Sequence, residues 1–281
     1  MADIEKPAGF ELTPTKFFMI ILGLALLWAW AGGAKRFAHD SGIPFTPREE
    51  LKGGVSFGAK NSPYKNMLFL TRIEGARDNE QQREHISIKA ASTNTTMLTL
   101  TGLSLGSGRN VLTTKIGQGA LLPYAGEVSP LENIVIAPNE EAIVVSGRSP
   151  IGISFKVNKC SAYLGSLQLF TPSLPQACPS PQETLSRSGA RLDAACSTYV
   201  RSLSACAVPV SLPTNLSREC RTNLLNVLTY NGCVNVHHFD PDFFSPEWRI
   251  YLGADRELWN DSKEIIKLLD TNGNIIDAIK Y

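Results

Sequence analysis

The chain has 281 residues, of which 43% are hydrophobic and 19% are charged, and its formal net charge is +1. This composition is ordinary for a globular protein, so it argues against a chain that is disordered throughout. The near-neutral charge, with no stripe of Lys and Arg, argues against binding to a nucleic-acid backbone, and we expect no nucleic-acid partner.

An uncharged apolar run covers residues 17–34, after an amino-terminal tail of residues 1–16. Basic residues flank the run on both sides, and Trp28 and Trp30 lie near its end, where aromatic rings favour the membrane–water boundary. A helix of about 18 residues is roughly 27 Å long, which is enough to cross a hydrocarbon layer. We therefore expect one transmembrane helix that anchors the protein in the cell membrane.

A cleaved signal peptide is the alternative for this run, because Ala29-Trp30-Ala31 has the small-x-small pattern of a cleavage site. Signal peptides usually have a short, net positive leader and an apolar core of about 7–15 residues. The leader here is longer, and its three acidic residues outnumber its two lysines. These features favour the uncleaved anchor.

Two signals disagree about the side of the membrane that holds the carboxy-terminal part. Four basic residues follow the span closely and two precede it, which favours a cytoplasmic domain. All six cysteines also follow the span, however, and no two of them form a C-x-x-C metal motif. An even set of cysteines indicates disulfides, which persist in oxidising compartments. We expect the carboxy-terminal domain on the extracytoplasmic side, with the cytoplasmic side as the alternative.

Residues 35–65 show little periodicity and are rich in Gly, Pro and Ser, so we expect a flexible spacer. From residue 66 onward, apolar and polar residues alternate as they do in half-buried strands, most clearly in residues 86–90, 153–157 and 248–252. Further short apolar runs are bounded by Gly, Pro and Asn: residues 67–73, 97–100, 134–136 and 142–145. The spacing predicts a mainly β protein with a β-sandwich over residues 66–281.

One segment, residues 159–246, breaks the strand pattern and contains every cysteine: Cys160, Cys178, Cys196, Cys206, Cys220 and Cys233. Apolar residues recur at helical spacing over residues 192–203 and 216–228, which predicts two short helices. Since strands precede and follow the segment, we interpret it as a helical insertion at one end of the sandwich. Disulfides worth about 2–4 kcal/mol each would compensate for its small core.

The order of the six cysteines favours pairs of neighbours: Cys160 with Cys178, Cys196 with Cys206, and Cys220 with Cys233. One straight helix that held both Cys196 and Cys206 would exclude their pairing, because it would separate them by about 15 Å, beyond the ~7 Å reach of a disulfide. The sequence therefore leaves the connectivity open.

Two groups of residues raise the possibility of catalysis. Residues 102–106, Gly-Leu-Ser-Leu-Gly, match the nucleophile elbow of a hydrolase, but that elbow requires a strand, a turn and then a helix. The Ser, Gly and Thr residues that follow do not predict a helix, so we expect Ser104 to have no catalytic role.

The second group contains His237, His238, Asp240 and Asp242, and imidazole with carboxylate can hold zinc. Adjacent residues in a loop seldom point the same way, and Asp240-Pro241-Asp242 is also an ordinary turn. We expect a polar loop with no metal and no cofactor. A membrane-anchored, metal-dependent hydrolase that uses this cluster is the alternative function.

Near the carboxy terminus, Asp270-Thr271-Asn272-Gly273-Asn274 separates two apolar runs, residues 265–269 and 275–279. Asn-Gly supplies the positive φ angles of a tight hairpin turn. A calcium loop of the EF-hand type would need a later Glu and flanking helices, which the sequence does not provide. We therefore predict a β-hairpin.

Several stretches at this end resemble the closing strands of a lamin-tail domain: Leu258-Trp259-Asn260, Ile266-Lys267-Leu268-Leu269-Asp270, Asn272-Gly273-Asn274, Ile276-Asp277 and Tyr281. Three earlier stretches resemble that family's E-Y-I-x-I strand, its L-x-G-W-x-L turn and strand, and its L-x-P-G-E turn, in that order: residues 84–88, 100–105 and 136–140. The chain departs from the family at His85, Leu103 and Asn139, which replace Tyr, Trp and Gly, and in its cysteine-rich insertion.

The resemblance covers roughly residues 66–157 and 248–281, and it implies an immunoglobulin-like β-sandwich that acts as an interaction or targeting module. Bacterial members are often attached to membrane-bound or secreted proteins, and the family has no catalytic residues to transfer to this chain. We expect a surface-displayed protein-interaction or scaffolding module without catalytic activity, whose partner is a protein or an envelope component. The insertion is its expected recognition surface, since inserted loops on a rigid scaffold often carry function. A purely structural envelope protein is a further possibility.

Overall fold

The computed structural model describes residues 19, 22, 62–74, 83–107, 113–256, 258–259 and 264–280 of the chain. The expected tail, transmembrane helix and spacer, residues 1–65, lie almost entirely outside these residues. None of the helices formed by the described residues is long and apolar enough to span a membrane. The chain divides into two compact units, Met1–Phe57 and Gly58–Tyr281, and nearly all described residues belong to the second.

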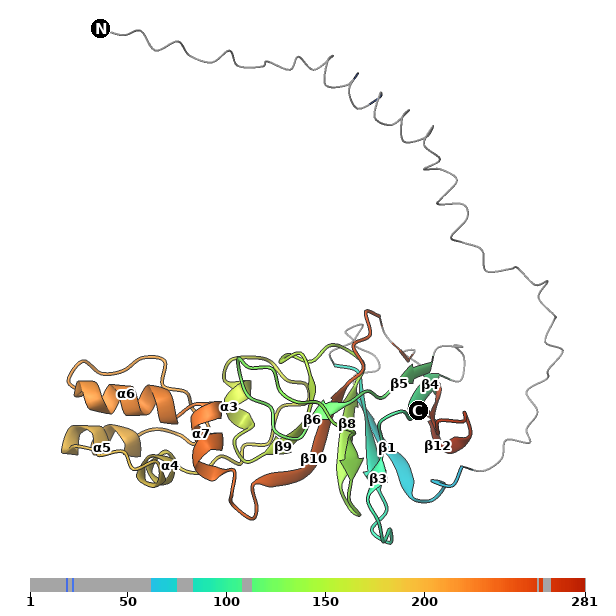
Figure 1. The fold of residues 1–281 in the computed structure, drawn as a ribbon, viewed down its shortest axis with the longest axis horizontal. Helices are drawn as coiled ribbons and strands as arrows, with labels where there is room; N and C mark the ends of the chain where they lie inside the picture. The colour runs from blue at the N-terminus through green and yellow to red at the C-terminus, as the bar shows by residue number, and fades with distance from the viewer. Residues whose placement is uncertain are drawn as a thin grey trace, which may run out of the picture. The chain divides into compact units, whose positions relative to one another are not determined.

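The second unit consists mainly of β-strands, as the alternating pattern predicts, and its largest sheet has six strands (Figure 1). In spatial order these are β1 (Leu68–Glu74), β2 (His85–Ala90), β8 (Glu141–Val145), β10 (Phe244–Tyr251), β9 (Ser154–Asn158) and β6 (Gly119–Ala120). β8 pairs with β10, and β6 with β9, in parallel, whereas the other neighbours are antiparallel. The central strand β10 therefore lies between two strands that precede it in the chain.

Two smaller sheets complete the β part of this unit. One has the order β12 (Ile275–Lys280), β11 (Ile265–Leu269), β4 (Ser104–Ser107) and β5 (Thr113–Lys115), and the other pairs β3 (Leu98–Thr99) with β7 (Val135–Ile136). β11 and β12 form the hairpin that the sequence predicts. Gly273 adopts a φ of 81°, and the Asp270 carboxylate accepts hydrogen bonds from the backbone N–H groups of Asn272 and Asn274.

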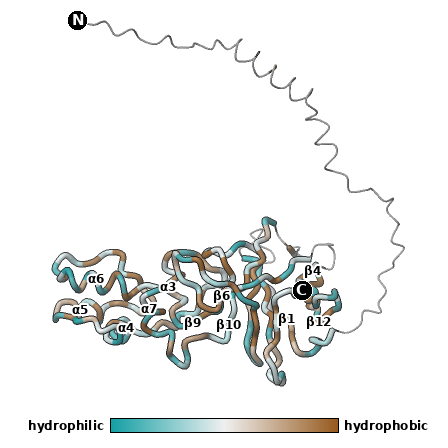
Figure 2. The backbone as a smooth tube through the Cα atoms, in the orientation of Figure 1, coloured by the Kyte–Doolittle hydropathy of each residue, from teal (hydrophilic) through white to brown (hydrophobic). Residues whose placement is uncertain are grey.

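Apolar side chains from all three sheets share one core: Leu68, Leu70, Ile86, Ile88, Ala90, Leu98, Leu100, Leu103, Leu105, Ile116, Ile134, Ile136, Ala142, Val144, Trp248, Ile250, Leu258, Trp259, Ile266, Leu268 and Ile276. The Trp248 indole on β10 donates to the Val135 carbonyl on β7 at 3.0 Å, which joins two of the sheets. The hydropathy of the chain reflects this core, because hydrophobic stretches follow the strands in Figure 2.

The inserted segment begins and ends at neighbouring strands of the largest sheet. Asn158 at the end of β9 pairs with Phe244 at the start of β10, and the Lys159 N–H donates to the Phe243 carbonyl at 2.9 Å. The insertion therefore covers residues 159–243 and ends before the expected residue 246, because β10 begins earlier than its alternating pattern indicates.

Five helices occupy this segment: α3 (Ala162–Gly165), α4 (Pro181–Arg187), α5 (Ala194–Arg201), α6 (Arg218–Val227) and α7 (Tyr230–His237). Helices α5 and α6 confirm the two that the periodicity predicts, and the other three were missed. A glycine usually disfavours a helix interior, so the sequence around Gly232 does not indicate α7. Gly232 nevertheless lies inside α7, where a Cβ atom would collide with the backbone carbonyls of Asn226 and Val227.

The three disulfides join Cys160 to Cys233, Cys178 to Cys206 and Cys196 to Cys220, so the neighbour pairing favoured by chain order is wrong. Cys196 and Cys220 each lie in the first turn of a helix, and their Cα atoms are 5.8 Å apart. Cys206 lies beyond the end of α5, with a φ of 62°, and reaches Cys178 before α4. Neighbours in space, and not neighbours in sequence, determine the pairs.

The insertion has two layers with separate cores. The inner layer packs α3 and α7 against β9 through Phe155, Val157, Cys160, Tyr163, Leu164, Phe170, Leu174, Tyr230, Cys233, Val234 and Phe243. The outer layer, called here the helical lobe, packs α4, α5 and α6 around Leu185, Cys196, Val200, Leu216, Cys220, Leu224 and Leu228. Figure 1 shows α5 and α6 at the end of this unit that is farthest from β12.

Removal of the Cys196–Cys220 disulfide tests whether the helical lobe depends on this cross-link. When both cysteines are changed to alanine, we expect the free energy of unfolding of the lobe to fall by about 3 kcal/mol, because the linked residues are 24 positions apart in sequence. Hydrogen exchange of the α5 and α6 amides should become about a hundredfold faster. The amides of β2 and β8 are the control, and equal acceleration there would show that the lobe and the sheet unfold as one unit.

Candidate functional site

The four candidate metal ligands do not converge on one point. His237, at the end of α7, is fully buried, with Nδ1 2.9 Å from Asp240 Oδ2 and Nε2 3.2 Å from Thr184 Oγ1. The His238 ring packs against Phe239, and the exposed Asp242 contacts Lys159. Among the described residues, no group of three or more His, Cys, Asp or Glu side chains is placed to hold a metal ion.

Asp240 is instead the centre of an ion-pair cluster, called here the Asp240 cluster, that contains Lys159, Arg187 and His237. Arg187 Nη2 lies 2.6 Å from Asp240 Oδ1, and Lys159 Nζ lies 3.1 Å from Asp240 Oδ2. The hydrogen bonds from the Arg187 guanidinium hold the pKa of the Asp240 carboxyl well below its usual range. Since Arg187 belongs to α4 and Lys159 follows β9, the cluster connects the helical lobe to the sheet.

The serine of the possible nucleophile elbow lies within a strand. Ser104 is the first residue of β4, which continues to Ser107 and pairs with both β5 and β11. A nucleophile elbow places its serine at a sharp turn between a strand and a helix. The local structure of Ser104 therefore differs from that of a hydrolase nucleophile.

An apolar groove of about 670 Å³ lies where the insertion meets the loops of the sheet. Its lining residues come from the loop after β6, from the residues before β9, from α3 and the residues after it, and from α7: Pro123, Tyr124, Ala125, Gly126, Glu127, Val128, Ser129, Leu131, Pro150, Ile151, Ile153, Leu164, Leu167, Gln168 and Tyr230. The exposed fractions are 100% for Val128, 72% for Leu167 and 49% for Leu131. Large apolar side chains therefore face solvent along the groove.

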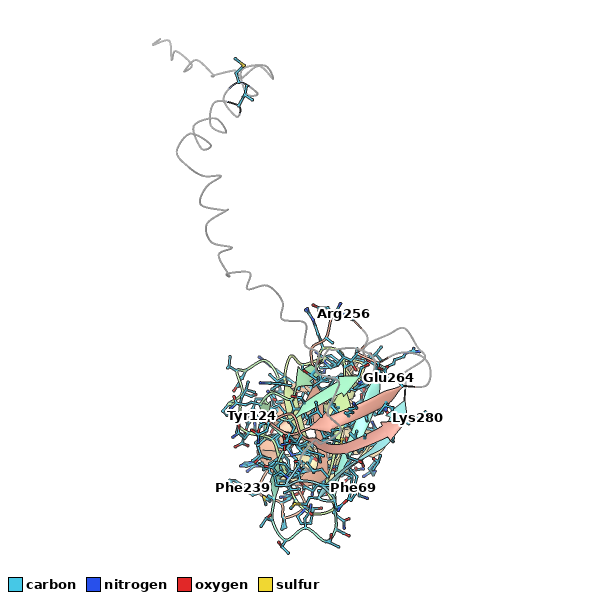
Figure 3. All side chains as sticks on the ribbon, turned by 90° about the vertical axis from the view of Figure 1, so that its right-hand side faces the viewer. Phe69, Tyr124, Phe239, Arg256, Glu264 and Lys280 are labelled. Carbon is cyan, nitrogen blue, oxygen red and sulfur yellow. A yellow bond between two sulfur atoms is a disulfide. The ribbon has the colours of Figure 1, made fainter. Side chains whose placement is uncertain are left out.

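The outer wall of the groove, residues 123–131, is hydrogen-bonded to the insertion. The Asn231 side chain of α7 accepts from the Ala125 N–H and donates to the Ala125 carbonyl, both at 2.9 Å. Within the wall, the Tyr124 N–H donates to Ser129 Oγ at 3.0 Å. Figure 3 places Tyr124 on the side of this unit opposite Lys280, away from the edge strand β12. The groove is thus a preformed part of the junction between sheet and insertion.

Buried side chains of the inner core form one side of the groove. Tyr230 of α7 is buried, and its hydroxyl accepts a hydrogen bond from the Asn158 side chain at the end of β9 at 3.0 Å. This burial raises the pKa of the Tyr230 hydroxyl above its usual range. Leu164 of α3 is 5% exposed and lies beside it in the same inner core.

A second hollow of about 590 Å³, called here the arginine cleft, adjoins the groove. Its lining residues are Arg83, Arg148, Ser149, Pro150, Leu169, Phe170, Thr171 and Tyr251. Arg148 Nη2 lies 2.5 Å from Asp255 Oδ1, and both side chains are more than two thirds exposed, at 72% and 79%. Burial raises the pKa of the Tyr251 hydroxyl in this cleft to about 12, so it stays protonated at neutral pH.

Sequence reasoning located the insertion but missed the loop of residues 121–131 that forms the other side of the groove. Its signal was weak, because Leu121 and Val128 are apolar residues in a Pro- and Gly-containing stretch without periodicity. Comparisons of the chain with protein-family models, curated proteins and solved structures found no match in any of the three. The geometry of this junction is therefore the basis for assigning a function.

The Asp240 cluster should make the stability of the chain depend on pH. Because the pKa of Asp240 is lowered on folding, its contribution is fully present above about pH 5, where the carboxyl is ionised in both states, and is lost progressively as the pH falls further. We expect Asp240→Asn to lower the free energy of unfolding by roughly 1–2 kcal/mol at pH 7, with a difference that shrinks below about pH 5.

Denaturant unfolding of both proteins from pH 7 down to pH 3 measures this difference. Asp242→Asn is the matched control, since Asp242 also contacts Lys159 but its side chain is 79% exposed. A constant difference between the Asp240→Asn variant and the native chain over this range would contradict the assigned role of the ionised carboxylate.

Proposed function

We propose that this chain is a membrane-anchored, surface-displayed module that binds a protein or envelope partner and has no catalytic activity. The observation that carries the proposal is the apolar groove, along which Val128, Leu131 and Leu167 are exposed to solvent. Contiguous exposed apolar surface with a polar rim is typical of interaction sites, because an apolar surface without a partner has an unfavourable hydration free energy.

Two features favour binding over hydrolysis. In the candidate metal cluster, the cationic side chains of Lys159 and Arg187 already contact the Asp240 carboxylate, which a metal ion would need as a ligand. Ser104 lies in a paired strand and not at the strand–helix turn of a nucleophile elbow. The metal-dependent hydrolase is therefore the weaker alternative.

We also propose that the three sheets form an immunoglobulin-like sandwich of the lamin-tail type. Two stretches that carry the resemblance meet in space, because the buried Glu84 carboxylate accepts hydrogen bonds from the backbone N–H groups of Leu258 and Trp259 at 3.0 and 2.8 Å. Asn139, which replaces a family glycine, has a φ of 70°, a conformation that Asn tolerates better than most residues. Leu103, which replaces Trp, is buried in the core.

Two observations support the proposed location on the outside of the cell membrane. The run of residues 17–34 is apolar and long enough for a membrane span. All six cysteines form disulfides, and none is free, which is expected of a domain in an oxidising compartment. The basic residues that follow the run remain the argument for the opposite orientation.

Labelling of intact cells with a membrane-impermeant thiol reagent tests this location. We expect no labelling of the native chain, because its cysteines are all paired in disulfides. After treatment with an impermeant reductant and mild denaturation, we expect labelling of up to six cysteines, because the reductant can reach disulfides that lie outside the membrane. An amino-terminal cysteine added before residue 16 is the control for membrane integrity. Cysteines that react only after lysis, without any reductant, would place the domain in the cytoplasm.

Site-specific photocrosslinking tests the binding function on intact cells. With the photoreactive amino acid benzoylphenylalanine at position 167, we expect one or a few discrete adducts, since this side chain is exposed on the groove. Val128→Asp should abolish these adducts, because an ionised carboxylate in the groove opposes burial of an apolar partner.

The matched control is Val210→Asp, at a valine that is 89% exposed but belongs to neither the groove nor the arginine cleft. Adducts should persist in this variant. If no adduct forms, or if Val128→Asp leaves every adduct unchanged, the groove is not a binding site and the proposed function is wrong.

A further inference from the structure

The apolar groove and the arginine cleft form one continuous surface. Pro150 lines both hollows, and the segment of residues 167–171 runs along both, with its first two residues in the groove and its last three in the cleft. The loop that carries Pro150 is held in place by a hydrogen bond of 2.6 Å from Ser149 Oγ to the Ile153 carbonyl. A single bound segment can therefore contact both hollows.

The two hollows differ in charge. Glu127 is the charged residue in the lining of the groove, whereas Arg83 and Arg148 are the charged residues in the lining of the cleft. Guanidinium groups bind carboxylates through paired hydrogen bonds of fixed geometry. The surface is thus complementary to a ligand that is apolar in one part and carries a carboxylate in the next.

Asp255 shows that a carboxylate can bind at Arg148. The pair is short, at 2.5 Å, but both side chains are largely exposed, and exposed ion pairs contribute little to stability. A carboxylate of a partner can therefore replace Asp255 without a large loss of folding free energy. Arg249, by contrast, is buried and donates to the carbonyls of Pro172 and Ser173, so it belongs to the fold and not to this surface.

We infer that the occupant is a peptide segment of a partner protein, with two large apolar side chains that enter the groove and an acidic side chain, a few residues away, that binds Arg148. This inference rests on the proposed function and adds the chemistry of the partner. A peptide fits better than a lipid surface, because both hollows are recessed, at about 670 and 590 Å³, and Glu127 would repel anionic headgroups.

Panning of a phage-displayed library of random dodecapeptides on the full chain in detergent micelles tests the inference. We expect recovered peptides to share a pair of large apolar residues and an acidic residue within about four positions of that pair. Their affinity should fall about tenfold on Arg148→Glu, since a charge-assisted hydrogen bond contributes roughly 1.5 kcal/mol. A loss of similar size should follow Val128→Asp, and none should follow Val210→Asp.

Two reciprocal variants sharpen the test. Asp255→Asn removes the internal competitor of Arg148 and should tighten binding of the acidic peptides a few-fold. The same library panned on the Arg148→Glu chain should yield peptides with Lys or Arg in place of the acidic residue. Because Arg148 and Asp255 are exposed, both variants should retain the thermal unfolding midpoint of the native chain within a few degrees.

The inference is overturned if no peptide is recovered, if recovered peptides have no acidic preference, or if their affinity is insensitive to Arg148→Glu. Phosphatidylglycerol vesicles that bind with the same dependence on Val128 and Arg148 would assign the surface to a membrane instead. Photocrosslinking at position 167 that depends on Val128 but not on Arg148 would retain the proposed function and reject only this choice of partner.

Discussion

The pairing of β9 with β10 is the constraint on which the rest of the structure depends. Because Asn158 and Phe244 are partners in adjacent strands, the 159–243 insertion must leave the sheet and return to it at a single point. The Cys160–Cys233 disulfide lies just beyond that point and joins residues 73 positions apart in sequence. Closing a long loop costs conformational entropy on folding. The disulfide lowers this cost, because it already restricts the conformations of the unfolded chain.

The same constraint produces the layered insertion. Helices α3 and α7 pack on β9 because they lie near the two ends of the insertion, and they form a core that the sheet completes. Helices α4, α5 and α6 lie farther along the loop and form a separate small core with its own disulfide. The Asp240 cluster connects these layers, because Arg187 of the outer lobe contacts Asp240 after α7, so the lobe is attached through polar contacts as well as through the chain.

The groove is a consequence of this junction and could not exist in either part alone. The loops of the sheet contribute residues from 123–131 together with Pro150, Ile151 and Ile153, and the insertion contributes residues of α3 and α7 and the residues after α3. Asn231 holds the two parts together across the wall. A hollow between rigid elements needs little rearrangement when a partner binds, so more of the contact free energy is retained as affinity. This is the physical basis for a binding role at this position.

Features that depend on neighbours in the chain were determined by the sequence itself. Alternation of polar and apolar residues predicted β2, β9 and the second half of β10, and short apolar runs predicted β1 and β8. The Asn272-Gly273 turn predicted the β11–β12 hairpin, and the 3.6-residue period predicted α5 and α6. The even cysteine set predicted disulfides.

Features that depend on distances between remote segments were decided only by the tertiary structure. No local pattern encodes which cysteines pair or that Arg187 contacts Asp240, because these residues are remote in sequence. The close packing of Gly232 against the backbone at the end of α6 likewise depends on how α6 and α7 are arranged. The groove is of the same kind, since Val128, Pro150 and Leu167 come from three separate segments. Local periodicity indicates which face of one helix or strand is buried. A site between elements depends on how those elements pack together, and the order of residues along the chain does not specify that packing.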